Sequence, residues 1–164
     1  PLRDSFREFY GMTSAQADEA SEKYGEYFSR QGIFENKLYA GIPELLSALQ
    51  AQGATLAIAT SKPDFLAERI ARHFGFRDRF TLICGGTAYG PCSTKAGGTL
   101  AQLRIDDPSQ AVMIGDRRFD IEGAAAAGME SIGVLWGYGS REELEKASPD
   151  YLAADIPELR RILG

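Results

Sequence analysis

The sequence is poor in the residues that build metal clusters and disulfide frameworks, with two cysteines and one histidine among 164 residues. Cys84 and Cys92 show neither CxxC nor Cys/His spacing, which argues against a zinc site. Two cysteines are also too few for a disulfide framework in a domain of this size. We therefore expect both thiols to be reduced and the protein to be cytoplasmic.

Long apolar runs and basic runs are also absent. No run approaches the roughly 20 apolar residues that span a bilayer, and the N-terminus lacks a signal pattern. The net charge is -5, and no Lys/Arg-rich stretch interrupts the mixture of signs. These features exclude a membrane partner and disfavour a nucleic-acid partner. With 44% hydrophobic residues, the chain has enough apolar material for one compact domain and a small additional lobe.

The first forty residues have helical periodicity. The chain opens on Pro1, without an initiator methionine, and runs directly into this pattern, so we expect it to begin inside a longer protein. Gly11 ends a first helix, and Thr13 and Gln16 have the spacing of a capping box for a second helix that ends before Gly32. The pattern predicts a helical hairpin over residues 1–40.

From residue 41 to residue 164, apolar strand patterns alternate with helical ones. This alternation predicts an α/β fold with a doubly wound parallel sheet. Helices are predicted from Pro43, Pro63, Lys95, Phe119 and Pro157. The predicted strands are residues 55–60, 80–84, 111–114, 131–135 and 151–153.

Polar residues follow the first of these strands. In an open parallel sheet, ligands bind beyond the carboxyl ends of the strands. Thr60 and Ser61 stand at that point, where hydroxyl and backbone N–H groups at a helix start suit a phosphate oxygen. The alternative is that Ser61 is simply the N-cap of the following helix.

Two further strand ends are also polar. Asp116 and Asp120 follow the strand at 111–114 and can hold a hard cation such as Mg²⁺, although taken in isolation the motif fits turn and helix-capping roles better. Lys95 begins a helix, where its charge opposes the helix dipole unless a phosphate or carboxylate lies nearby. The alternative for Lys95 is a solvated surface position.

The order of these motifs resembles the haloacid-dehalogenase superfamily, in its phosphoglycolate-phosphatase-like and nucleotidase-like branch. The segment AIATSKP resembles the second family motif, and Lys95 resembles the third. The segment MIGDRRFDIEGAAAAG, followed by GVLWGYG, resembles the fourth motif and its continuation. The opening PLRDSF and the hairpin resemble the helical cap, so the resemblance implies a partial cap over 1–40 and a partial Rossmann-like core over 41–164.

The resemblance also implies roles for individual residues. Thr60 and Ser61 would bind the phosphoryl group, and Lys95 would neutralise its charge and orient the nucleophile. Asp116 would bind magnesium, with Asp120 supporting the metal directly or through water. The implied activity is magnesium-dependent hydrolysis of a small phosphorylated metabolite through an aspartyl-phosphate, with phosphoglycolate and nucleoside monophosphates as leading substrates.

The chain departs from the family at one place. Members carry a nucleophilic and a general-acid aspartate in an apolar strand followed by DxDGT, and no DxDGT occurs in this sequence. That segment would also supply a central first strand of the sheet. We therefore expect this chain to be an inactive fragment; the alternatives are a non-catalytic phosphate-binding remnant and a receiver-like signalling domain.

Overall fold

The structure, a computed structural model, describes residues 2–86 and 95–164. The chain divides into two compact units, Pro1–Leu38 and Tyr39–Gly164. Each unit has its own helices, and the second contains every strand in the described residues. Among the described helices, none is long and apolar enough to cross a membrane.

The first unit is a helical hairpin. Helix α1 (Leu2–Tyr10) packs against α2 (Ser14–Arg30), and the 3-10 helix Gly32–Phe34 follows. The predicted capping box is present: the backbone N–H of Gln16 donates to Thr13 Oγ1 at 3.3 Å, and that of Thr13 donates to Gln16 Oε1 at 3.0 Å. An ion pair between Arg3 and Asp18 also joins the two helices.

The second unit alternates helices and strands, as the sequence predicts. Its helices are α3 (Ile42–Ala51), α4 (Asp64–His73), α5 (Lys95–Leu103), α6 (Arg118–Ala127), α7 (Arg141–Ala147) and α8 (Ile156–Leu163). Its strands are β1 (Ala57–Ala59), β2 (Leu82–Cys84), β3 (Val112–Gly115), β4 (Glu130–Val134) and β5 (Tyr151–Ala153). Short 3-10 helices occur at Arg77–Arg79 and Pro108–Gln110.

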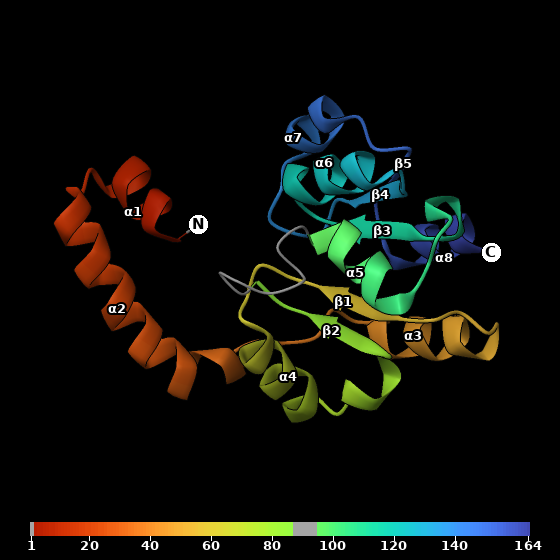
Figure 1. The fold of residues 1–164 in the computed structure, drawn as a ribbon, viewed down its shortest axis with the longest axis horizontal. Helices are drawn as coiled ribbons and strands as arrows, with labels where there is room; N and C mark the ends of the chain where they lie inside the picture. The colour runs from red at the N-terminus through yellow and green to blue at the C-terminus, as the bar shows by residue number, and fades with distance from the viewer. Residues whose placement is uncertain (1, 87–94) are drawn as a thin grey trace. The chain divides into compact units, whose positions relative to one another are not determined.

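The strands form two parallel sheets. One has the order β1-β2 and the other β3-β4-β5. Ile58 lies opposite Ile83 in the first sheet, and Ile114 lies opposite Ile132 in the second. Figure 1 shows the arrows of β1 and β3 pointing in the same direction. The predicted parallel α/β fold is therefore confirmed, with its sheet in two pieces.

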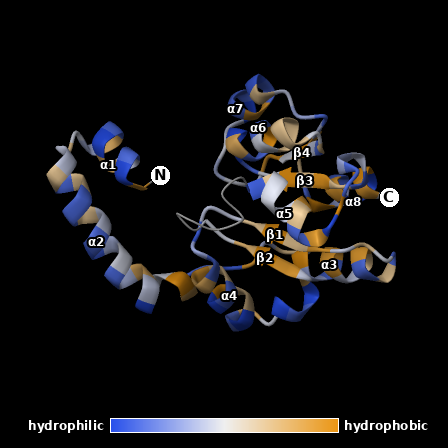
Figure 2. Ribbon diagram, viewed as in Figure 1, coloured by the Kyte–Doolittle hydropathy of each residue, from blue (hydrophilic) through white to orange (hydrophobic). Residues whose placement is uncertain are grey.

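The core fills the space between strands and helices. Leu45 of α3 and Leu159 of α8 pack against Ile132, Val134 and Ala153, all of them at most 7% exposed. A second cluster joins Ala67 and Ala71 of α4 to Ile83 of β2. Figure 2 shows the strands in hydrophobic colours and many hydrophilic residues on the helices around them. Burial of these apolar faces is the main stabilising contribution to the fold.

Helix α6 has a clear local cause for its end. Gly128 has a φ of 72°, a left-handed conformation that glycine adopts without the steric cost of a Cβ. The sequence predicts this helix at 119–127, and the structure begins it one residue earlier, at Arg118. The start of α6 matters for the site because Asp120 lies in its first turn.

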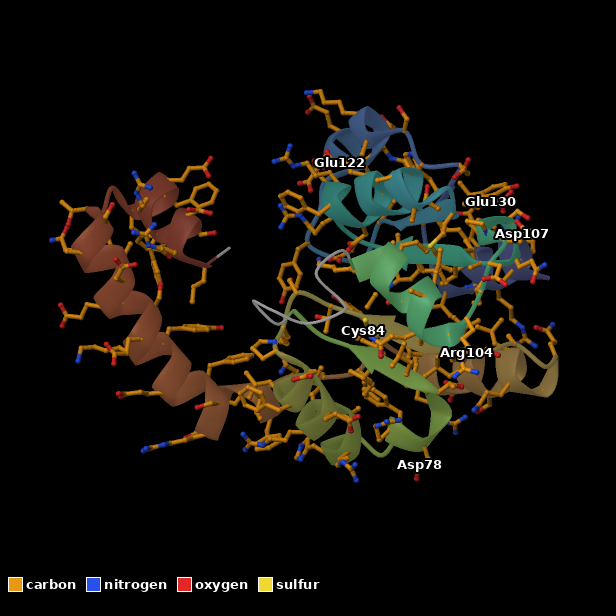
Figure 3. All side chains as sticks on the ribbon, in the orientation of Figure 1. Asp78, Cys84, Arg104, Asp107, Glu122 and Glu130 are labelled. Carbon is orange, nitrogen blue, oxygen red and sulfur yellow. The ribbon has the colours of Figure 1, made fainter. Side chains whose placement is uncertain are left out.

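Cys84 corrects one expectation. It is 1% exposed at the end of β2, where Figure 3 labels it, and it is disulfide-bonded. The expectation of a reduced thiol was wrong for Cys84, because the lack of framework spacing does not exclude a single bridge. Cys92 lies outside the described residues.

Candidate functional site

Asp116 directly follows β3 and is held by the loop that follows β4. Its side-chain Oδ2 accepts a hydrogen bond from the backbone N–H of Tyr138 at 2.7 Å, and its carbonyl accepts one from Gly139 at 3.0 Å. A Cβ at Gly137 would lie 2.1 Å from the Cβ of Asp116, and one at Gly139 would lie 2.1 Å from its carbonyl oxygen. The two glycines therefore permit the close approach that orients this carboxylate.

Asp120 lies in the first turn of α6 with 18% of its side chain exposed. Its Oδ2 accepts a hydrogen bond from the backbone N–H of Arg117 at 3.1 Å, so the expected helix-capping role is real. Gly115 packs directly against it, since a Cβ added there would lie 2.2 Å from the Cβ of Asp120. The end of β3 thus fixes the position of both aspartates.

Lys95, the first residue of α5, lies close to Asp120. Its Nζ lies 4.0 Å from Oδ1 of Asp120, and its side chain is 31% exposed. The two oxygens of Asp120 therefore have different neighbours: one caps the helix and the other faces the lysine. This pairing places Lys95 beside the carboxylate of Asp120.

The electrostatic balance at Asp120 is unfavourable for a bare carboxylate. Burial raises the pKa of Asp120 above its usual range, and the negative charge of Asp116 raises it further. The backbone N–H of Arg117 and the positive charge of Lys95 act in the opposite direction without cancelling the effect. A bound cation would relieve both the burial cost and the repulsion between the two carboxylates.

Thr60 and Ser61 occupy the loop between β1 and α4. The Thr60 backbone N–H donates to the carbonyl of Cys84 at 2.9 Å, and Thr60 Oγ1 accepts from the N–H of Lys62 at 3.2 Å. Ser61 is exposed and is not the N-cap of α4, because that position belongs to Pro63. The capping alternative for Ser61 was therefore wrong. The structure brings Lys95, Asp116 and Asp120 together, while Thr60 and Ser61 stand on a neighbouring loop.

Glu143 is a residue that the sequence analysis missed. Its Oε1 lies 2.7 Å from Nε of Arg117 and accepts a hydrogen bond from the backbone N–H of Arg118 at 3.1 Å. The hydrogen bond from Arg117 holds the pKa of Glu143 below its usual range. One carboxylate thus ties α7 to the start of α6, which carries Asp120.

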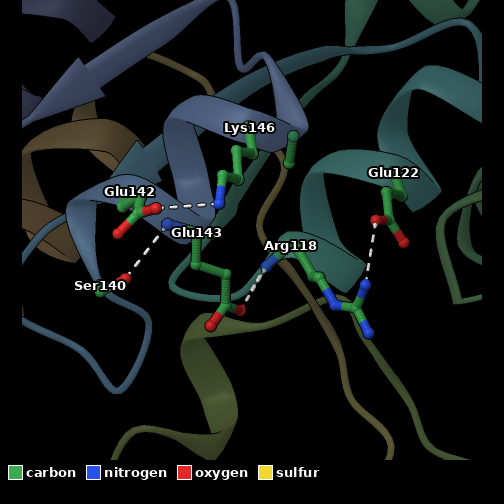
Figure 4. Close-up of a pocket in the computed structure, with 7 residues that line it drawn as sticks. Arg118, Glu122, Ser140, Glu142, Glu143 and Lys146 are labelled. Atoms are coloured by element: carbon green, nitrogen blue, oxygen red, sulfur yellow. Dashed lines mark hydrogen bonds and ion pairs between the residues drawn. The ribbon is translucent and has the colours of Figure 1, made fainter.

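Glu143 and Arg118 also line a polar pocket of about 500 Å³ (Figure 4). Ser140 lies on its wall, and its Oγ accepts a hydrogen bond from the backbone N–H of Glu143 at 3.1 Å. Ser140 and Glu143 stand three residues apart, the spacing of a capping box. That spacing was the available sequence signal, although it points to a helix start and not to a contact with α6.

The donor set suits magnesium better than a softer metal. Within residues 2–86 and 95–164, no group of three or more His, Cys, Asp or Glu side chains is placed to hold a metal. Asp116 and Asp120 offer two hard carboxylates, and proteins commonly bind Mg²⁺ through one or two carboxylates, with water and substrate phosphate completing the shell. Asp116 and Asp120 are therefore the described residues that could hold such a cation.

Comparison with known proteins decides the family. The model of the haloacid dehalogenase-like hydrolase family matches residues 1–134. The chain belongs to this family. The match confirms the predicted membership, and it sets the receiver-like alternative aside.

Individual relatives of the family cover nearly the whole chain. A 5'-nucleotidase of Pseudomonas aeruginosa is 41% identical over 99% of this chain and 75% of its own length. The tyrosine-protein kinase PtkA of Mycobacterium tuberculosis is 42% identical over 90% of this chain, which spans only 52% of that protein. The crystal structure of a putative phosphatase from Clostridium difficile is 41% identical with a TM-score of 0.89, and the match covers 100% of this chain and 78% of that one.

Proposed function

We propose that the chain is the larger part of a magnesium-dependent phosphomonoester hydrolase. The proposal depends on one observation: Nζ of Lys95 lies 4.0 Å from Oδ1 of Asp120, and Asp116 lies nearby at the end of β3. A positive charge next to two hard carboxylates suits a site that binds a phosphoryl group and a divalent cation together. The relative named 5'-nucleotidase supports the reaction class.

Each residue has a proposed part in the reaction. Lys95 neutralises charge on the phosphoryl oxygens, and Thr60 and Ser61 bind those oxygens from the loop after β1. Asp116 and Asp120 hold magnesium, which when bound neutralises further negative charge on the phosphoryl group. The attacking carboxylate would come from an aspartate segment in the longer protein and would form an aspartyl-phosphate that water then hydrolyses.

The helical unit is proposed to select the substrate. We assign residues 1–40 as a partial cap and residues 41–164 as the core, a division supported by the compact unit Pro1–Leu38. Nucleoside monophosphates are the first substrates to examine, because the relative at 41% identity is named a 5'-nucleotidase. Phosphoglycolate is the second, on the resemblance of the motifs.

The test is hydrolysis by the longer protein, assayed with both substrates in magnesium and again after chelation. We expect turnover with magnesium, none after chelation, and none from residues 1–164 alone, since they lack the nucleophile. Turnover by the 164-residue chain, or turnover by the longer protein that survives chelation, would contradict the proposal.

A second candidate is transfer of a phosphoryl group to a protein tyrosine. The observation that favours it is the 42% identity to PtkA over 90% of this chain. Both candidates use the same phosphoryl site but differ in donor and acceptor: a phosphomonoester and water in hydrolysis, a nucleoside triphosphate and a phenol in transfer. Incubation with a γ-labelled nucleoside triphosphate and a tyrosine peptide tests the second candidate: label in the peptide supports transfer, and an unlabelled peptide together with release of phosphate from a nucleoside monophosphate supports hydrolysis.

A further inference from the structure

Two aromatic side chains stand exposed beside the proposed metal site. Phe119 lies in the first turn of α6, directly before Asp120, and is 47% exposed. Tyr138 lies in the loop after β4 and is 89% exposed, and its backbone N–H donates to Oδ2 of Asp116 at 2.7 Å. Each aromatic residue is therefore tied to one of the two carboxylates through the backbone, while its ring remains open to a ligand.

Arg117 connects the two aromatic residues. Its guanidinium carbon lies 5.8 Å from the centre of the Phe119 ring. A Cβ added to Gly139, the neighbour of Tyr138, would lie 3.5 Å from Cδ of Arg117. The loop after β4 therefore packs on the same side chain that contacts Phe119. Tyr138 and Phe119 thus belong to one continuous surface at the carboxyl ends of β3 and β4.

A second guanidinium group completes this surface. The guanidinium carbon of Arg118 lies 4.6 Å from the centre of the Phe119 ring. Both arginines lie within the range of roughly 6 Å over which a cation is attracted to an aromatic ring. Glu143 fixes Arg117 at 2.7 Å, and Glu122 lies 4.0 Å from Arg118. The surface thus combines aromatic rings with planar groups that carry N–H donors.

The chemistry of this surface favours a planar polar ligand over an apolar protein segment. An apolar segment would take two guanidinium groups out of water without offering them new hydrogen-bond acceptors, which is costly. A nucleobase combines a π face, which stacks on aromatic rings and guanidinium planes, with polar edges that form hydrogen bonds. Such stacking tolerates any base, because every base has a π face. The surface therefore suits a nucleobase.

We propose that Phe119 and Tyr138 form an aromatic rim that binds the base of a nucleoside monophosphate, while its phosphoryl group lies at Lys95, Asp116 and Asp120. This inference rests on the proposed function and names the residues that select its substrate. Both rings extend from backbone that holds the carboxylates, so a substrate anchored there presents its base to them. The rim acts on binding, because a neutral ring offers no charge to the phosphoryl group.

The test compares adenosine 5'-monophosphate with ribose 5-phosphate as substrates of the longer protein. Only the first carries a base, so the ratio of their kcat/KM values isolates the contribution of the base. Phe119→Leu and Tyr138→Leu should each lower this ratio by roughly fivefold or more, through a higher KM for adenosine 5'-monophosphate. Any disturbance of the phosphoryl site acts on both substrates and cancels in the ratio.

Conservative variants separate stacking from packing. Phe119→Tyr and Tyr138→Phe keep an aromatic face and should hold the ratio within about twofold of the wild type. Tyr151→Leu is the matched control, because Tyr151 is 46% exposed but begins β5, at the amino end of that strand. A ratio that stays at the wild-type value in either Phe119→Leu or Tyr138→Leu, with or without a loss of Tm, would overturn the proposal.

Binding of adenosine, which has no phosphoryl group, separates this inference from the proposed function. Calorimetric titration of the longer protein with adenosine should show one saturable site, with a Kd that rises by roughly fivefold or more in each leucine variant of the rim. That result supports the rim even where neither phosphomonoester is hydrolysed, an outcome that would contradict the proposed function alone. Adenosine binding that is absent, that is unchanged in these variants, or that is weaker than binding of a tyrosine peptide would overturn the rim.

Discussion

Nε of Arg117 lies 2.7 Å from Oε1 of Glu143, and the same oxygen accepts a hydrogen bond from the backbone N–H of Arg118 at 3.1 Å. This contact ties α7 to the start of α6, only a few residues from both aspartates of the proposed magnesium site. A partly exposed ion pair alone contributes little to stability, typically below about 1 kcal/mol. Its importance here is the position of the loop that carries Asp116 and Asp120.

Glu143→Ala should therefore weaken magnesium activation more than it weakens folding. In the longer protein we expect the magnesium concentration for half-maximal activity to rise several-fold, with a loss of about 1–2 kcal/mol of stability. Glu142→Ala is the matched control, because Glu142 pairs with Lys146, away from Arg117 and Arg118. Equal magnesium dependence in the two variants would show that the contact does not position the site.

The same pair predicts a pH dependence of stability. The hydrogen bond from Arg117 lowers the pKa of Glu143 in the folded state. The stabilisation is therefore fully present above the unfolded pKa, about 4.3 for glutamate, and is lost as pH falls through the lower folded value. Wild-type and Glu143→Gln proteins should differ in Tm at pH 6, and the difference should shrink as the pH falls below about 4.3. A difference that stays constant across this range would contradict the assignment.

Gly115 offers a steric test of the position of Asp120. A methyl group at Gly115 would lie 2.2 Å from the Cβ of Asp120, so Gly115→Ala must displace that side chain or the strand end. We expect magnesium activation to fall at least tenfold. Gly123→Ala is the control, since nothing lies within 4 Å of its added Cβ and alanine favours a helix interior by roughly 0.5–1 kcal/mol. Normal magnesium dependence in Gly115→Ala would place Asp120 outside the metal site.

Lys95 provides the test of phosphoryl binding. Lys95→Ala removes the charge proposed to act on the transferring group and should lower turnover by roughly two orders of magnitude or more. The control is Lys146→Ala, because the side chain of Lys146 is 74% exposed and pairs with Glu142. Steady-state rates at saturating magnesium measure both. A near-wild-type rate for Lys95→Ala would return this lysine to a surface role.

Local signals in the sequence were sufficient to predict several features of the structure. The capping box of Thr13 and Gln16, the glycine that ends α6 and the alternation of strands and helices each depend on residues close together in the chain. The same local signals suggested Ser61 as an N-cap, and the structure gives that position to Pro63. Ser61 stands two residues before Pro63, whereas the helix begins at Asp64, directly after the proline.

Features that depend on distant residues were not predictable in the same way. Glu143 contacts Arg117 although the two residues are 26 positions apart in the sequence, and no local pattern indicates that contact. The pairing of Lys95 with Asp120 follows only once α5 and α6 are packed together. The division of the sheet follows from which strands pair, and the exposure of Ile114 then depends on that division.

Substitution of Asp116 tests the proposed magnesium site most directly, because the carboxylate of this residue is proposed to bind the metal. Magnesium should be titrated against activity in the longer protein and in its Asp116→Asn and Asp120→Asn variants, with thermal unfolding followed in each. We expect Asp116→Asn to raise the magnesium requirement at least tenfold, equivalent to about 1.4 kcal/mol of binding free energy, and Asp120→Asn to raise it less. Magnesium should also raise the Tm of the wild type more than that of Asp116→Asn. Unchanged magnesium dependence in Asp116→Asn, or equal losses of stability in both variants without any metal effect, would contradict the proposed site.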